Sequence, residues 1–213
     1  MKKYFFVCSL IILITASLGW SGCKKKDTTA PAIYLNGSDP VTISLGSTYT
    51  DAGASATDDV DGTITDKIVT KGLPINTNLV GTYTIYYDVS DAAGNAAFEI
   101  TRTVYVINDA ANFGGKYNES TYCTSTLSAP DTITASSSIN NRVTISNFGL
   151  NMAASIYADI LSNNITITAQ TVGSHVYWGS GTVTNNSSVL VISYSDSLIS
   201  GSTTTCTSTY TKQ

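Results

Sequence analysis

The sequence predicts an all-β protein that is exported from the cell. Only 12% of the residues are charged, and Ser, Thr, Asn and Gly fill the polar positions instead. β-branched and aromatic residues recur in short runs, and turn-forming residues separate these runs. Disordered chains combine high charge with few such β-formers, so the composition indicates a folded protein.

The first 22 residues have the pattern of a secretory signal peptide. Lys2 and Lys3 precede an apolar run over residues 4–18, which is too short to span a membrane as a stable helix. Ser21, Gly22 and Cys23 then resemble the cleavage site of a bacterial lipoprotein, in which the cysteine is acylated. The resemblance implies a mature chain that begins at a lipidated Cys23. Plain secretion and an uncleaved anchor are the alternatives.

Residues 23–31 are expected to form a polar tether between the lipid and the folded protein. Its lysines, at positions 24–26, can lie against anionic head groups. The chain as a whole has a formal net charge of −4, so it offers no basic face for nucleic acid. We therefore expect a lipid-anchored protein of the outer membrane, displayed at the cell surface, with the membrane as its partner through the lipid.

Strand signals begin after Pro31 and continue to residue 107. The clearest run, residues 80–89, places Tyr83, Ile85 and Tyr87 on one face. In the run 96–107, Arg102 shares a face with apolar residues. We therefore expect either a bulge at Arg102 or an edge position from which its side chain reaches solvent.

Several sequence blocks in this region follow one another in a specific order. They are A-P-x-I-x-L-x-G, D-D-V-D-G-x-I-T, V-G-T-Y-T-I-x-Y-x-V-S-D-A-A-G-N and T-R-T-V-x-V. Together they resemble a bacterial Ig-like domain of the type also found in a pesticidal crystal protein and common on exported proteins. The resemblance implies an antiparallel β-sandwich over residues 32–108. It implies no activity, because such sandwiches host many functions and are often spacers.

A second β domain is predicted over residues 115–213, after a short polar and glycine-rich linker at 109–114. Eight strand-like segments follow one another at close spacing: 115–124, 131–138, 142–148, 150–160, 164–170, 175–184, 188–195 and 202–211. Short links favour hairpins, so the segments are expected to form an antiparallel meander. With an even number of strands, the first and last can pair and close a small lipocalin-like barrel.

The cysteines provide a test of this closure. Cys8 leaves with the signal peptide and Cys23 takes the lipid, which leaves Cys123 and Cys206. Two thiols in an oxidising compartment predict one disulfide. It would link the first and last segments of the barrel. A metal site is the weaker interpretation, because these cysteines and the single histidine, His175, supply too few ligands.

The residues that could carry catalysis are sparse. His175 lies at the start of a predicted strand with no nucleophile motif beside it. Glu99 and Glu119 are the only glutamates, and they fall in different domains. Tyr177 and Trp178 alternate along a strand, so one ring is expected inside and one outside, without a broad aromatic platform. We expect no enzyme and no cofactor.

An acidic loop is the best candidate for a metal site. Asp58, Asp59 and Asp61 are close in sequence, and Asp91 can approach from a neighbouring loop; carboxylates of this kind bind Ca²⁺. The spacing lacks a known calcium-loop pattern, however. Asp before Gly also forms Asx turns, and Asp91 with Asn95 can simply close a hairpin. We therefore expect turns here and no metal.

The leading functional hypothesis is a monomeric, non-catalytic surface lipoprotein. Its Ig-like domain would be a spacer that presents the C-terminal domain to a surface glycan or a protein partner. The alternative is a carrier that holds a small apolar ligand inside the barrel. A filled interior would favour the first hypothesis, and Leu150, Met152, Ile156 and Ile160 are the candidates to fill it.

Overall fold

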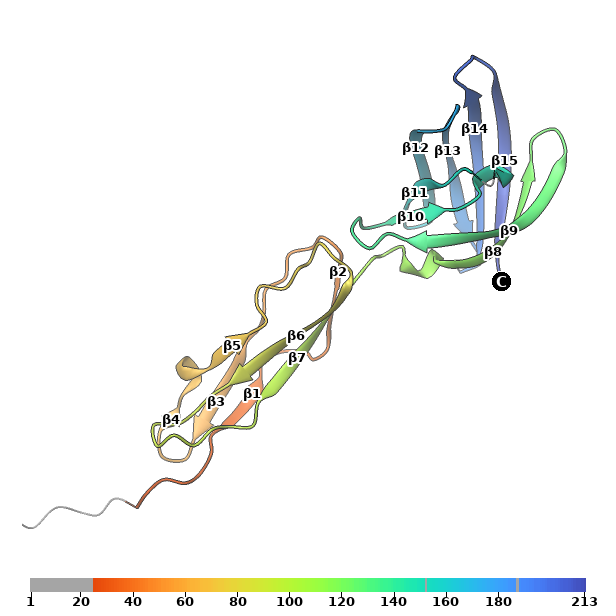
Figure 1. The fold of residues 1–213 in the computed structure, drawn as a ribbon. Helices are drawn as coiled ribbons and strands as arrows, with labels where there is room; N and C mark the ends of the chain where they lie inside the picture. Colours follow the sequence, from red (N-terminus) through yellow and green to blue (C-terminus); the bar gives the residue numbers. More distant parts are fainter. Residues whose placement is uncertain (1–24, 152, 187) are drawn as a thin grey trace, which may run out of the picture.

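The computed structural model describes residues 25–151, 153–186 and 188–213 (Figure 1). The predicted signal peptide, the lipidation site Cys23 and Met152 lie outside these residues. Within them, the chain is all β apart from three single-turn 3₁₀ helices: η1 (Thr65–Lys67), η2 (Ala111–Phe113) and η3 (Phe148–Leu150). None of the helices in the described ranges is long and apolar enough to cross a membrane. The predicted all-β class is confirmed.

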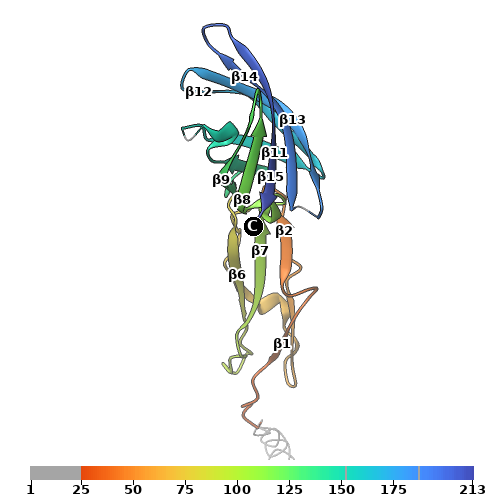
Figure 2. The ribbon, with the colours of Figure 1, turned by 90° about the vertical axis from the view of Figure 1, so that its right-hand side faces the viewer.

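The molecule is elongated, with two β modules placed end to end (Figures 1 and 2). Residues 25–31 run without regular structure into the outer end of the first module. The second module lies at the opposite end of the first, so the described chain begins at one end of the molecule and the barrel forms the other end (Figure 1).

The first module is a sandwich of two sheets. Its strands are β1 (Ala32–Leu35), β2 (Val41–Ser44), β3 (Ala54–Asp58), β4 (Gly62–Thr63), β5 (Val69–Lys71), β6 (Gly81–Asp88) and β7 (Ile100–Ile107). One sheet has the order β1-β3-β4 and the other β2-β7-β6-β5. Every pair is antiparallel except β2 with β7, which is parallel. The predicted inward face of β6 is confirmed, since Ile85 and Tyr87 are fully buried.

The expectation for Arg102 was wrong. This residue is 1% exposed, and β7 keeps regular register with β6 through it. Its guanidinium forms an ion pair with buried Asp51 and donates to the backbone oxygens of Asn36 and Ser38. Tyr87 donates from its hydroxyl to Asp51 at 2.5 Å. The charge can lie in the core because a carboxylate and backbone carbonyls satisfy the donors of the guanidinium.

The second module is an eight-stranded antiparallel barrel. Its strands are β8 (Gly115–Tyr122), β9 (Thr126–Ala135), β10 (Arg142–Ile145), β11 (Ile156–Leu161), β12 (Asn164–Val172), β13 (His175–Thr184), β14 (Val189–Leu198) and β15 (Thr203–Lys212). Neighbours in sequence pair with each other, and β15 pairs with β8. The predicted meander and its closure by the first and last strands are confirmed.

Closure is complete only in the half of the barrel that lies next to the sandwich. β10 pairs with β9 only at residues 133–135, and β11 pairs with β12 only at residues 164–166. The other strands continue beyond these short partners, and residues 126–130 of β9 are all exposed. The distal half is therefore splayed open between β9 and β12 (Figure 1).

Side chains fill the closed half of the barrel. Inward-facing aliphatic and aromatic residues are almost wholly buried there: Ile133, Val143, Ile145, Phe148, Ile156, Ile160, Ile165, Ile167, Leu190, Ile192 and Tyr210. Gly181 on β13 has a different role, since a Cβ at this position would lie 2.2 Å from the backbone oxygen of Val191 on β14. The glycine lets the two strands approach closely where the sheet curves.

The two modules are joined by a hydrogen-bonded connection. Asn108 is 2% exposed, and its side-chain amide donates to the backbone oxygens of Ser136, Ile139 and Arg142. Its side-chain oxygen accepts from the backbone of Asn141. Part of the predicted linker belongs to the barrel as well, because Ala110 and Phe113 pack in the barrel core.

Candidate functional site

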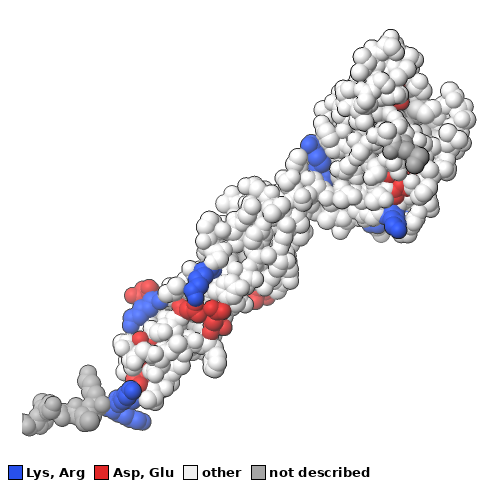
Figure 3. Space-filling model, viewed as in Figure 1, with Lys and Arg blue, Asp and Glu red and all other residues white. Residues whose placement is uncertain are grey.

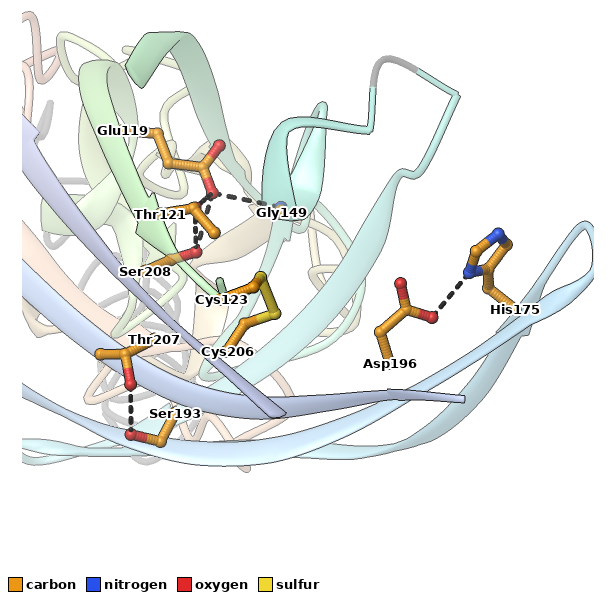
Figure 4. Close-up of a disulfide and its surroundings, with 10 residues drawn as sticks. All are labelled: Glu119, Thr121, Cys123, Gly149, His175, Ser193, Asp196, Cys206, Thr207 and Ser208. Atoms are coloured by element: carbon orange, nitrogen blue, oxygen red, sulfur yellow. Dashed lines mark hydrogen bonds and ion pairs between the residues drawn. A yellow bond between two sulfur atoms is a disulfide. The ribbon is translucent and has the colours of Figure 1, made fainter. Parts of the chain in front are cut away.

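The splayed half of the barrel exposes part of its inner surface. We call this surface the distal face and define it by the partly exposed, inward-facing residues Cys123, His175 and Asp196 (Figure 4). Thr121, Tyr177 and Cys206 lie next to them and are buried. These six residues come from β8, β13, β14 and β15 and from the position that follows β8. The face is open because β10 and β11 do not reach it.

The disulfide lies at the floor of the distal face. Cys123 and Cys206 are bonded, with their Cα atoms 4.3 Å apart. The register that places Thr207 opposite Tyr122 also places Cys206 opposite Cys123. The predicted bond between the first and last segments is thus confirmed, and it fastens the β8–β15 seam near the level at which the barrel opens.

A histidine–aspartate pair lies beside the disulfide. His175 Nδ1 is 2.6 Å from Asp196 Oδ1, and both side chains are partly exposed. The His175 ring stacks on Tyr177, whose hydroxyl accepts from the Asn151 amide at 3.0 Å. Our sequence reasoning missed Asp196 as the partner. The β13–β14 hairpin register, which pairs Tyr177 with Asp196, is the signal that could have found it.

This pair has no nucleophile in contact with it among the described residues. Within the same residues, the His175 ring makes its hydrogen bond to Asp196 alone, with no Ser, Thr or Cys as a second partner. A catalytic dyad of the hydrolytic type needs such a nucleophile in contact with the base. The pair instead presents an imidazole and a carboxylate at partly exposed positions.

Glu119 organises the floor of the barrel below the distal face. It is 1% exposed, and its Oε1 accepts from the hydroxyls of Thr121, Ser208 and Tyr210 at 2.7, 2.9 and 2.9 Å. The backbone N–H of Gly149 donates to the same oxygen at 3.1 Å, which holds η3 against the barrel. Burial, and then the charge of Glu119, raises the pKa of Tyr210.

Tyr177 and Trp178 point to opposite sides of β13, as predicted. Tyr177 is 1% exposed inside the barrel, where it packs edge-on against Phe148. Trp178 is 38% exposed on the outer surface. The two rings therefore form no shared platform.

The acidic loop of the sandwich is organised by turns. Asp58 Oδ1 accepts from the backbone of Val60 and Asp61 at 2.9 and 2.8 Å. Asp61 itself turns away to accept from the backbone of Ala92 at 2.6 Å. Asp59 accepts from the hydroxyl of Thr29. The predicted calcium candidates are thus each engaged with different partners.

A different trio of carboxylates gathers at this end of the sandwich. Oxygens of Asp27, Asp58 and Asp91 lie within 4.8 Å of one another. Asp91 also accepts from the backbone and side chain of Asn95, as expected for a hairpin closure. Burial raises the pKa of Asp91, but the hydrogen bonds from Asn95 outweigh it and hold the pKa below its ordinary value.

Comparison with known proteins identifies the first module. Residues 33–106 match the family described as bacterial surface protein, Ig-like domain. The predicted Ig-like resemblance is therefore confirmed for this part of the chain. No curated protein sequence matches the chain at a significant level.

Two solved structures show a remote likeness to the chain. A lipoprotein of Bacteroides thetaiotaomicron is 18% identical, with 86% of this chain and 100% of that chain covered and a TM-score of 0.35. CBM51-2, in complex with GlcNAc, and the INT domains of Clostridium perfringens ZmpB are 16% identical, with a TM-score of 0.31. The second match covers 85% of this chain and 44% of that one.

Proposed function

We propose that this protein is a non-catalytic, lipid-anchored surface protein whose distal face binds a neutral polar partner, such as a surface glycan. The observation that carries the proposal is the end-to-end arrangement of the two modules (Figures 1 and 2). With the lipid on Cys23, the Ig-like domain would stand next to the membrane. The splayed end of the barrel would then be the part farthest from it.

The connection between the modules supports a spacer of fixed direction. Asn108 is buried and bonds to the β9–β10 loop, and Val80 of the sandwich donates from its backbone to Ser137 in the same loop at 2.9 Å. Asp109 accepts from the hydroxyl of Ser44 at 2.8 Å. A connection with this many bonds holds the barrel at one orientation to the sandwich.

The filled interior of the closed half argues against the carrier alternative. Small-ligand sites are concave spaces of several hundred Å³ with apolar walls. Here the expected interior residues Ile156 and Ile160 are 1% and 2% exposed, and Tyr177, Tyr194 and Phe148 pack against one another above them. We therefore expect a ligand to bind at the distal face and not inside the closed half of the barrel.

The chemistry of the distal end favours a neutral partner. Charged residues gather on the sandwich and near the base of the barrel, and the upper barrel is almost free of them on the side shown (Figure 3). The distal face instead offers the His175–Asp196 pair, with both side chains partly exposed. A few fixed donors and acceptors without a basic patch suit sugar hydroxyls better than phosphate or nucleic acid.

The proposal is tested by binding of the mature chain to an array of bacterial and host glycans. We expect a bound class of neutral glycans, and we expect His175→Ala with Asp196→Ala to reduce the signal at least tenfold. Tyr105→Ala, which removes an exposed ring from the sandwich, is the matched control and should bind as the wild type does. Equal binding by both variants would place the site elsewhere and contradict the proposal.

A further inference from the structure

Two acidic side chains lie inside the barrel below the distal face. Glu119 on β8 and Asp131 on β9 are 1% and 3% exposed. The β8–β9 register pairs Tyr117 with Asp131 and Glu119 with Ala129. The two carboxylates are thus diagonal neighbours on the same, inward side of one antiparallel pair of strands, a position from which side chains interact.

Each of these carboxylates has a buried oxygen without a partner. Within the described chain, Glu119 Oε2 and Asp131 Oδ2 are shielded from solvent and make no hydrogen bond. The second oxygen of Glu119 points away from the hydroxyls of Thr121 and Ser208 (Figure 4). Burial of an ionised oxygen without a partner is costly, so two such oxygens on neighbouring strands call for a ligand.

The other contacts of these two residues supply no counter-charge. Four donors converge on Glu119 Oε1 and, among the described residues, leave Oε2 without a partner. None of the ion pairs in the described residues includes Glu119 or Asp131. Lys212 donates to the backbone of Asn112, and Arg142 pairs with Asp159.

Asp131 also connects this pair to the surface. Together with Lys116, Asn147 and Gln213 it lines a cleft of about 340 Å³. The backbone N–H of Thr132 donates to Asp131 Oδ1 at 2.5 Å, which leaves Oδ2 as the oxygen without a partner in the described chain. The cleft would give a cation a route from solvent to this oxygen.

We propose that a hard divalent cation binds between Glu119 Oε2 and Asp131 Oδ2. Two ionised carboxylates match its two charges, and oxygen ligands select Ca²⁺ or Mg²⁺ over softer metals. Ca²⁺ fits better, because it accepts irregular coordination and water can complete the shell through the cleft. The ion would fasten β9 to β8 and, through Oε1 and Gly149, would hold η3 below the distal face.

Calorimetric titration of CaCl₂ into the mature chain at pH 7.5 tests the proposal. With only two protein ligands, we expect a Kd of about 0.1–1 mM, the range of weak extracellular sites. Asp131→Asn should weaken binding at least tenfold and should still fold, because it removes a buried charge. Glu119→Gln should weaken binding as well. Asp58→Asn is the matched control, since it alters the carboxylate trio of the sandwich and should bind Ca²⁺ as the wild type does.

Three outcomes would overturn the proposal. The first is the absence of any heat of binding at 10 mM CaCl₂. The second is Ca²⁺ affinity that falls in Asp58→Asn and persists in Asp131→Asn, which would place the ion in the sandwich. The third is a wild-type Tm that is higher at pH 5 than at pH 7.5 and does not change with Ca²⁺, while the two barrel variants lack this pH dependence. That result would mean that the two unpartnered oxygens share a proton and do not bind a cation.

Discussion

Arg102 in the sandwich and Glu119 in the barrel are two of the charged residues that strands of this protein direct into its cores. Both occupy inward positions in the alternation of side chains along their strands, so the alternation alone is consistent with a buried side chain at each position. Our interpretation of Arg102, as a bulge or as an edge position that reaches solvent, gave the charge more weight than the alternation. The partners that make burial possible, Asp51 and the hydroxyls around Glu119, are distant in sequence and leave no local signal.

Replacement of Arg102 by Leu should destabilise the sandwich strongly. It leaves Asp51 buried without its cation, and loss of one partner of a buried pair costs about 3–5 kcal/mol. Urea unfolding followed by far-ultraviolet circular dichroism measures the change. Lys71→Ala is the control, because its pair with Asp88 is exposed and screened by solvent, so its loss should change the free energy of unfolding far less. Similar costs for the two variants would contradict the burial argument.

The pairing of Asp51 also predicts how acid affects the sandwich. Burial raises the pKa of Asp51, but hydrogen bonds from Tyr87, Tyr49 and Arg102 outweigh it and lower the pKa below the ordinary value. The folded state therefore binds the proton less tightly than the unfolded state does. The resulting stability is present above the unfolded pKa of about 4 and is lost as the pH falls below it.

Asp51→Asn tests this pH dependence. The variant should be less stable at pH 7 and should lose less additional stability than the wild type between pH 5 and pH 2.5. Chemical unfolding at several pH values gives both quantities. Parallel stability curves for the two proteins would show that another group governs the acid response.

At the scale of elements, the eight strands of the barrel were predictable and its opening was not. The second segment was expected to begin at residue 131, because 126–130 lacks apolar alternation, yet β9 begins at Thr126. The fourth was expected to begin at residue 150, but η3 occupies that stretch and β11 begins at Ile156. Strand pairing across the barrel sets these limits, and local sequence carries little information about it.

The disulfide should stabilise the barrel more than the sandwich. Cys206→Ser releases an 83-residue loop in the unfolded chain, and loss of a native disulfide of this kind costs about 2–5 kcal/mol. We expect the barrel transition to move to lower denaturant while the sandwich transition stays in place. Unfolding monitored by barrel Trp178 fluorescence and by sandwich hydrogen exchange separates the two. An unchanged barrel transition would contradict a role for the bond in closure.

Gly181 should be required for the curvature of the β13–β14 pair. A Cβ at Gly181 would clash with the backbone oxygen of Val191, which cannot move as a side-chain end can. Gly181→Ala should therefore lower the free energy of unfolding by about 1–3 kcal/mol, as overpacking does. Ser180→Ala, on the exposed side of the same strand, should change the free energy of unfolding little. Thermal unfolding compares the two, and a neutral Gly181→Ala would contradict the packing argument.

At the scale of the whole molecule, the junction decides whether the Ig-like domain can serve as a spacer. The sequence indicated a boundary after Asn108 from its polar and glycine-rich composition. It gave no sign that Asn108 would be buried, because its partners at residues 136–142 come from the next domain. The hydrogen bonds between the modules thus make the predicted linker a defined connection.

Asn108→Ala should loosen this connection. It removes three donated hydrogen bonds to the β9–β10 loop and two accepted ones from residues 110 and 141. Small-angle scattering should show a broader distribution of overall dimensions, and Asn112→Ala nearby should not. An unchanged scattering profile in Asn108→Ala would mean that packing of the modules, rather than these bonds, sets their orientation.

Surface display of the barrel with its splayed end outward is the central claim, and an epitope tag in the β14–β15 turn at Gly201 tests it most directly. Antibody staining of intact cells should detect the tag in the wild-type background. It should be lost from the cells when Cys23→Ala removes the lipid site. Staining that appears only after the cells are permeabilised, or that persists unchanged in Cys23→Ala, would contradict the claim.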